Sequence, residues 1–248
     1  MGCVAVLCGL LTGCGGGSHP ATTRSGSTTT TTASQPAQNV ARDRALGRLA
    51  LFRLSDFPAG WTAQPQEDEG NSRQLQQELA NCLQMDVSLL RSQPTRVESP
   101  NFSDSDETKI SNTVTYEPSV AVAEKWFRIF AASQTPACLT KAMATAIDEA
   151  LRRSAKTREA VRSAGVEIGK ATVAPMSFPR MADESIAFQV KVPISIKGFS
   201  VTYYDDLVAL RKGRAVAGVN VQSTVGSPDI PTSRRLTALT ASRLRDTQ

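Results

Sequence analysis

The sequence predicts an α+β fold in which an antiparallel sheet of about five strands packs against helices and one disulfide stabilises the domain. Two observations predict this class. Through the middle of the chain and again near its C-terminal end, apolar residues recur three or four positions apart, which is the spacing of one helix face. Between residues 184 and 223, apolar and polar residues alternate around short turn sequences, which is typical of antiparallel strands.

Four segments have the apolar spacing of helices. The first follows Ser72, which can cap a helix, and carries Leu75, Leu79 and Leu83 on one face. The complete set of expected helices covers residues 72–85, 119–130, 136–151 and 231–245. A helix with one apolar stripe needs a surface to cover, so we expect these helices to lie on one face of the sheet.

Five segments have the character of strands. They span residues 108–116, 166–174, 184–196, 199–211 and 214–223. Lys197-Gly198 and Lys212-Gly213 separate the last three segments at the positions where hairpin turns belong. Val190 and its alternate neighbours are apolar while the residues between them are mostly polar, which predicts one packed face and one wet face.

The first 14 residues combine an apolar run with a short motif of small residues. Residues 4–11 are apolar, but a helix that spans a bilayer needs roughly 20 residues. The sequence Leu-Thr-Gly-Cys that ends at Cys14 resembles the bacterial lipobox. The resemblance implies that residues 1–13 are a lipoprotein signal peptide and that Cys14 carries the acyl anchor. An ordinary secretory signal next to an unrelated cysteine is the alternative.

The segment after Cys14 is rich in Gly, Ser, Thr, Ala and Pro, so it has too little apolar surface to form a core. We therefore expect residues 14–45 to be a lipidated cysteine with a disordered tether, and residues 46–248 to be a single domain. The expected location is the outer face of the cytoplasmic membrane, where the lipid anchor would hold the chain.

Cysteine usage predicts the disulfide. Of the five cysteines, Cys3 and Cys8 fall in the expected signal peptide and Cys14 is the expected lipid site, which leaves Cys82 and Cys138. Disulfides persist outside the cytosol, so we expect these two residues to pair. A metal or redox pair is the alternative, but it would need further ligands or a close Cys-x-x-Cys spacing.

The chain is basic, with a formal net charge of +5 and a pI of about 9.1. For an exported domain, anionic lipid head groups or acidic wall polymers are more natural partners than nucleic acid. Lys and Arg nevertheless alternate with Asp and Glu along most of the chain, which favours an ordinary solvated surface. The expected partners are the membrane, an envelope protein or a wall component, with no nucleic acid.

Two aromatic residues, Phe57 and Trp61, stand on either side of a Pro-Ala-Gly turn. In one interpretation both rings fill an edge of the core. In the other they form a platform for carbohydrate or lipid, which makes them weak candidates for ligand-binding residues.

Catalytic and metal-binding patterns are scarce in this sequence. The only histidine, His19, lies in the expected tether, which argues against Ser-His-Asp catalysis and histidine-based metal sites in the domain. Asp205 and Asp206 are adjacent in an expected strand and point to opposite faces, so we expect at most one of them to face inward. We expect no enzymatic activity, no catalytic residue, no metal and no cofactor.

Several features together resemble a known group of proteins. They are the Pro-Ala-Gly-Trp turn that ends at Trp61, the pair Cys82 and Cys138, the hairpin with Arg211-Lys-Gly-Arg214, and the closing amphipathic helix. This combination resembles actinobacterial surface lipoproteins and the extracellular sensor domain of certain actinobacterial Ser/Thr kinases. The resemblance implies an exported α+β sandwich with a cleft and a ligand-sensing role. It supplies no catalytic residues.

Two functional classes remain. The first is a membrane-anchored, non-enzymatic binding or sensing module. The alternative is a carrier of lipid or another apolar ligand, which would need an unfilled apolar space of roughly several hundred Å³ between the sheet and its helices. Many helix positions that would face the sheet are alanine, and small residues are compatible with either a cavity or close packing.

Overall fold

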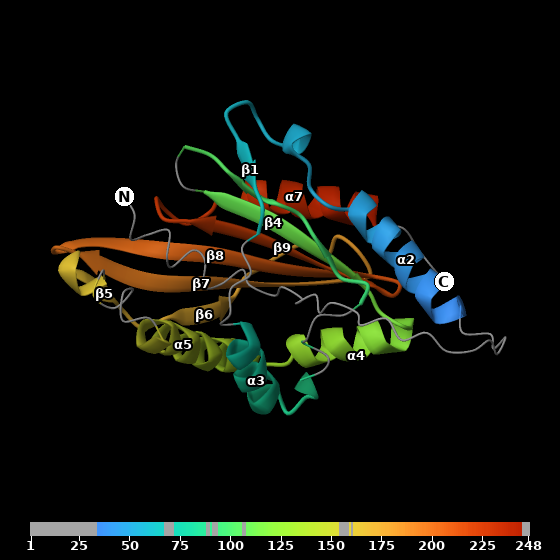
Figure 1. Cartoon of the computed structure of the whole chain (residues 1–248), viewed down its shortest axis with the longest axis horizontal. Helices are drawn as coiled ribbons and strands as arrows, with labels where there is room; N and C mark the ends of the chain where they lie inside the picture. Colours follow the sequence, from blue (N-terminus) through green and yellow to red (C-terminus); the bar gives the residue numbers. More distant parts are fainter. Residues whose placement is uncertain are drawn as a thin grey trace, which may run out of the picture.

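Figure 1 shows the computed structural model of the chain. It describes residues 34–66, 72–87, 90, 94–105, 108–153, 159 and 161–244. Over these residues the fold is α+β, with one antiparallel sheet and helices packed on it, and Cys82 is bonded to Cys138. The predicted class and disulfide are therefore confirmed, although the sheet has nine strands rather than about five. Residues 1–13 and Cys14 lie outside the described residues.

Nine strands make up the sheet in the described part of the chain. They are β1 (Thr62–Gln64), β2 (Val97–Glu98), β3 (Asn101–Ser103), β4 (Lys109–Tyr116), β5 (Val166–Ile168), β6 (Thr172–Pro175), β7 (Glu184–Ile196), β8 (Phe199–Lys212) and β9 (Ala215–Ser223). Their order is β1-β3-β4-β9-β8-β7-β5, with β2 paired to β4 and β6 paired to β7. The four long strands β4, β7, β8 and β9 were predicted, and the expected strand at residues 166–174 is divided between β5 and β6.

Tight turns at the predicted positions join the long strands β7, β8 and β9. Lys197 and Gly198 both have a positive φ, at 49° and 86°, as a two-residue hairpin turn between twisted strands requires. Gly213 has a φ of 57° in the next turn. These turns set a continuous register in which every residue of β7 pairs with β8.

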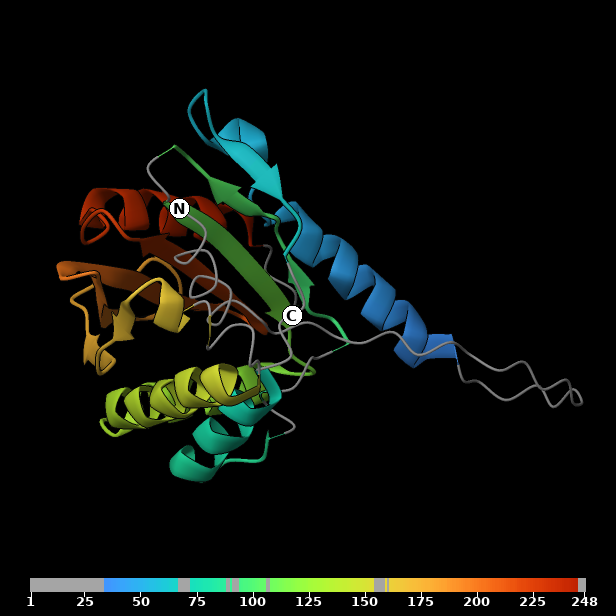
Figure 2. The same ribbon diagram turned by 60° about the vertical axis from the view of Figure 1, so that its left-hand side comes forward.

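The helices lie on both faces of the sheet. They are α2 (Ser34–Leu49), a 3-10 turn η1 (Leu54–Asp56), α3 (Ser72–Leu83), α4 (Val120–Phe130), α5 (Thr135–Arg153) and α7 (Ile230–Arg243). Figures 1 and 2 show α3, α4 and α5 on one face and α7 with α2 on the other. The expectation that helices cover a single face was therefore wrong. Its physical reason is that β8 and β9 carry apolar residues on both sides, as at Leu207 and Val208.

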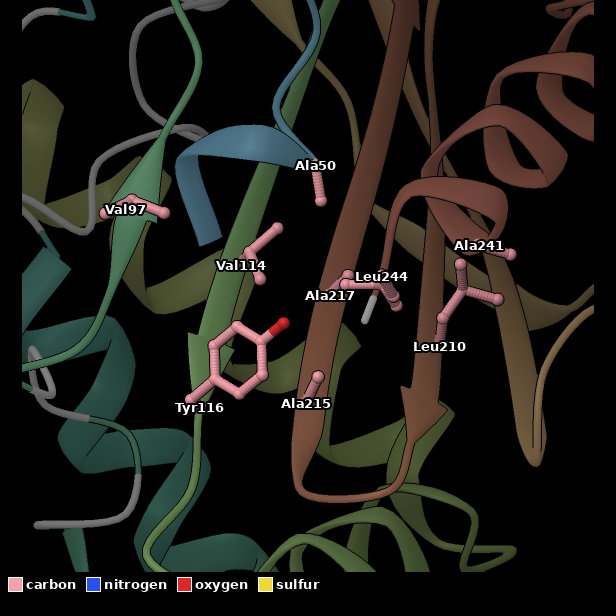
Figure 3. Packing of buried hydrophobic residues seen from close by; sticks show 9 residues of the cluster. All are labelled: Ala50, Val97, Val114, Tyr116, Leu210, Ala215, Ala217, Ala241 and Leu244. Carbon is pink, nitrogen blue, oxygen red and sulfur yellow. The ribbon is translucent and has the colours of Figure 1, made fainter. Parts of the chain in front are cut away.

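The face under α7 and α2 is closely packed. Leu236 of α7 is fully buried against Val208 and Val219 of the central strands. Figure 3 shows the neighbouring cluster, where Leu244 and Leu210 lie beside small residues such as Ala217. Alternate residues of the central strands therefore form a sealed hydrophobic layer with α7 and the end of α2.

Helix α2 starts at Ser34 and is part of the folded structure, so the ordered chain extends to the N-terminal side of residue 46. Asp43 is buried and accepts two hydrogen bonds from the guanidinium of Arg214, at 2.8 Å and 2.5 Å. A Cβ added at Gly47 would lie 2.7 Å from Val97, which shows how closely α2 approaches β2. These contacts attach α2 to the sheet.

The face under α5 has its own core. Met143 and Ile147 of α5 pack against Val190, Val192 and Tyr203 of β7 and β8. The Cys82–Cys138 disulfide joins α3 to the first turn of α5, with 5.5 Å between the two Cα atoms. Helices α3 and α5 are thus bonded to each other, and α5 anchors the pair to one end of the sheet.

Candidate functional site

One row of residues in the middle of the sheet is not sealed by the helices above it. The strand register places Thr113, Gly218, Ala209 and Ile186 side by side across β4, β9, β8 and β7. All four are half-buried, whereas their neighbours along β8 and β9, which face α7, are fully buried. The central strands are therefore closed on one face and open on the other.

Small side chains in this row create the open space. Gly218 has no side chain, and a Cβ added there would lie 3.0 Å from Thr113 Oγ1. Glycine in the interior of a strand weakens the strand, and it often marks a place where another group comes close to the backbone. Because Gly218 has no side chain and its neighbour Ala209 has only a methyl group, space remains above this part of the sheet.

Helices α4 and α5 cover this space on the side opposite the sheet. Trp126 and Phe130 of α4 stack with their ring centres 4.2 Å apart, and both rings are half-buried. Together with Leu139 of α5 they border a mainly apolar cavity of about 230 Å³, partly open to solvent, above the row just described. We call this space the sheet–helix cavity.

A second cavity of about 250 Å³ adjoins the first. The residues that contact both spaces are Arg96, Thr113, Trp126, Ala209 and Gly218. The second space extends toward α3, where apolar side chains such as Leu75 and Leu79 contact it. Together the two spaces form an elongated region between the sheet and helices α3, α4 and α5.

Arg96 is the charged residue that both cavities share. It donates a hydrogen bond from Nε to Glu98 Oε1 at 2.5 Å. The two side chains are 24% and 21% exposed, so the pair lies where the cavities approach the solvent. Among the described residues, Arg96 is the only charged one that contacts the sheet–helix cavity.

Polar side chains gather on the sheet at the other end of this cavity. Asn220 contacts the cavity and donates a hydrogen bond from Nδ2 to Asp205 Oδ1 at 2.8 Å. Burial raises the pKa of Asp205 to about 8, and the amides of Asn220 and Gln222 only partly oppose this rise. The Asp205 carboxyl is therefore protonated at neutral pH.

Asp206 lies on the opposite face of the sheet from Asp205, as the strand geometry predicted. It accepts hydrogen bonds from Gln189 Nε2 and from the hydroxyl of Ser233 in α7, both at 2.9 Å. Both acids are fully buried, which differs from the expectation that at most one would face inward, because helices cover both faces. The two carboxyl groups do not face one another across a cleft.

The two aromatic candidates have separate environments. Phe57 is buried and stacks between Trp61 and Phe102, with ring centres 4.8 Å and 4.7 Å away, so it fills the core edge. Trp61 is half-buried and borders a third space of about 320 Å³ near Asp229, which caps the N-terminus of α7. Neither aromatic residue contacts the sheet–helix cavity.

Two further observations concern metal binding and membrane-spanning helices. Within the described ranges, no group of three or more His, Cys, Asp or Glu side chains could hold a metal ion. None of the helices in those ranges is both long enough and apolar enough to cross a membrane. No protein-family model and no curated protein matches the chain.

The residues of the sheet–helix cavity were not identified from the sequence. Trp126 and Phe130 lie in the expected helix 119–130, where apolar residues that line a cavity cannot be told from ordinary core residues. Gly218 was the available signal, because a glycine inside a strand otherwise made of alternating apolar residues is unusual. The cavity needs the register of four strands, which brings together residues almost 100 positions apart, Thr113 and Ala209 among them.

Proposed function

We propose that this domain is a non-enzymatic binding module that holds a small apolar or amphipathic molecule in the sheet–helix cavity. The observation that carries the proposal is the half-buried row of Thr113, Gly218, Ala209 and Ile186 beneath the half-buried ring of Trp126. Central strands of a covered sheet are ordinarily sealed, as these are on their other face.

Physical size supports this proposal. A cavity of about 150 Å³ lined by aliphatic and aromatic side chains already admits benzene. The sheet–helix cavity of about 230 Å³ and its neighbour of about 250 Å³ offer room for a longer molecule. Covering apolar surface stabilises a complex by roughly 25 cal/mol per Å², so a ligand that replaces water there gains free energy.

The proposed setting is the outer face of the cytoplasmic membrane, with the chain anchored through Cys14. The support for it is the apolar run and Leu-Thr-Gly-Cys motif of residues 1–14, together with the disulfide, since disulfides persist outside the cytosol. In that setting a bound molecule would come from the membrane or the envelope. A role in carrying that molecule and a role in sensing it both begin with the same binding step.

An uncharged fluorescent probe tests the proposal. The chain is produced with export to an oxidising compartment and titrated with N-phenyl-1-naphthylamine, whose emission increases in apolar surroundings. We expect saturable binding. Ala209→Leu fills the floor of the cavity and should weaken binding at least about tenfold, since a leucine side chain occupies the space of several ligand atoms.

Ala63→Leu is the matched control, because Ala63 is an exposed alanine in strand β1 and does not contact the cavity. It should bind the probe as the unchanged protein does. If Ala209→Leu folds normally and also binds the probe with unchanged affinity, the cavity is not the binding site and the proposal is wrong.

A further inference from the structure

A strip of four polar residues interrupts the apolar surface of the sheet beneath α4 and α5. Ser111 on β4 pairs directly with Asn220 on β9, and Gln222 on β9 pairs directly with Asp205 on β8. The hydrogen bond from Asn220 to Asp205 joins the two pairs diagonally. We call these four residues the polar strip.

The polar strip has apolar neighbours on both sides along the strands. Ala209 and Gly218 form the floor of the sheet–helix cavity on one side, and Tyr203 and Val192 pack under α5 on the other. Ser111, Gln222 and Asp205 are at most 5% exposed. Polar groups in such a place lower the stability of the fold unless they are hydrogen-bonded.

Gln222 shows that the hydrogen bonding of the strip is incomplete. Its side chain is fully buried, and neither Nε2 nor Oε1 has a hydrogen-bond partner among the described residues. It lies close enough to lower the pKa of Asp205 without making a hydrogen bond of normal geometry. A buried amide without partners has one donor group and one acceptor group available.

Asp205 takes part in none of the ion pairs between described residues, and its hydrogen-bond partner is a neutral amide. The half-buried Lys109 of β4 pairs with Gln222 in the register and is separated from Asp205 by strand β9. Ser111 and Asn220 contact the cavity directly, so a ligand in the cavity reaches the strip at these two residues. Gln222 and Asp205 are the next residues on the same face of β9 and β8.

We propose that the polar strip binds an uncharged hydroxyl group of the ligand, while its apolar chain extends beneath Trp126 toward Arg96. A hydroxyl group both donates and accepts a hydrogen bond, which matches the amides of Asn220 and Gln222. A carboxylate or an ammonium group would lose much more hydration free energy than a hydroxyl group on entering this strip, where three of the four residues are almost fully buried. This inference rests on the proposed binding function and names the chemical class of its ligand.

Three ligands of equal chain length test the proposal on the full chain. The bound N-phenyl-1-naphthylamine is displaced with 1-decanol, decylammonium or decanoate at pH 7. We expect 1-decanol to displace the probe at a concentration at least about tenfold lower than either charged molecule, because only the alcohol enters the strip without losing the hydration of a charge.

Gln222→Met keeps the length of the side chain and removes its amide. We expect this variant to reduce the preference for 1-decanol to within about twofold, with an unchanged or higher melting temperature, since no existing hydrogen bond is lost. Gln64→Met, at an exposed position in strand β1, is the matched control and should keep the preference. A structural role of Gln222 would instead lower the melting temperature and leave the preference unchanged.

The outcomes separate the two proposals. If the probe binds and Ala209→Leu weakens it, but the three decyl ligands displace it equally or a charged one is best, the binding function stands and the hydroxyl inference is wrong. If Gln222→Met keeps the full preference for 1-decanol, the amide of Gln222 does not distinguish the hydroxyl ligand from the charged ones and the hydroxyl inference is wrong. If neither the probe nor any decyl ligand binds, both proposals fail.

Discussion

The carboxyl group of Asp205 is buried between a helical layer and the centre of the sheet, and it takes part in none of the ion pairs between described residues. Its pKa is about 8 because burial disfavours the charged form, whereas in the unfolded chain it returns to the ordinary value near 3.8. Between these two pH values the folded protein keeps a proton that the unfolded chain releases. Raising the pH through this window therefore favours unfolding.

We predict that the free energy of unfolding falls as the pH rises from 5 to 8, by up to about 4 kcal/mol from Asp205. Asp205→Asn should remove most of this loss, because asparagine does not titrate. Urea denaturation at both pH values measures the effect. Asp148→Asn, at an exposed helix position, is the control and should leave the pH dependence unchanged.

A pH dependence equally steep in Asp205→Asn would contradict this account. Part of the slope should survive in that variant, because burial also raises the pKa of Asp206 and acts in the same direction. Asp56 acts in the opposite direction, since its hydrogen bond with Arg243 lowers its pKa. That contribution is lost only below the ordinary carboxyl range and does not affect the comparison of pH 5 with pH 8.

At the residue scale, the sequence predicted the face to which a side chain points better than it predicted whether that side chain is buried. Adjacent strand residues point to opposite faces, and this correctly separated Asp205 from Asp206. Their burial depends on which helices cover each face, and that depends on the chain path of α7 and α5. Nothing local to the Tyr-Tyr-Asp-Asp segment carries this information.

Helices α3 and α5 form a pair that is held together covalently. The Cys82–Cys138 bond closes a sequence separation of 56 residues, and apolar residues such as Leu79 and Ala142 pack around it. Helix α3 contacts the second cavity, and α5 contacts the first through Leu139. The disulfide therefore fixes α3, which borders the second cavity, to α5, which packs on the sheet.

We predict that Cys82→Ala with Cys138→Ala lowers the free energy of unfolding by about 4 kcal/mol, since the unfolded chain regains the freedom of the closed loop. Urea denaturation with and without a reducing agent measures this. The reducing agent should destabilise the unchanged protein and have no further effect on the double variant. Equal denaturation midpoints for the two proteins under oxidising conditions would show that the bond contributes little.

At the element scale, length determined which parts were predictable. The strands β4, β7, β8 and β9 are 8 to 14 residues long and show a clear alternation, so their positions were predicted well. The strands β1, β2 and β3 have two or three residues each, which is too short for a periodic pattern. Helix α2 was missed because its apolar residues do not form a stripe.

The two faces of the molecule are packed to different degrees. Beneath α7 and α2 the alternate residues of the central strands are fully buried, whereas beneath α4 they are partly open. The fold class followed from patterns along the chain, but this asymmetry did not. It arises from the register of strands far apart in sequence and from the distance at which α4 lies above them.

We predict that ligand binding stabilises the whole domain. A ligand present at about 100 times its dissociation constant adds about 2.7 kcal/mol to the free energy of unfolding, which corresponds to a rise in melting temperature of roughly 5 °C or more. Thermal denaturation with 1-decanol measures the rise. Ala209→Leu should show almost none, and an equal rise in that variant would place the ligand elsewhere.

The two cavities between the sheet and its helices also affect how the molecule responds to hydrostatic pressure. Unfolding allows water to enter such voids, so the unfolded chain with its solvent occupies less volume than the folded protein, by roughly 20–100 mL/mol in ordinary domains. We expect the cavities of about 230 Å³ and 250 Å³ to lower the resistance to pressure on their face of the sheet, to the extent that water does not fill them, and the close packing beneath α7 to resist compression. Compression would therefore disrupt the molecule first along the α4 face, and an occupant of the cavity would protect that face.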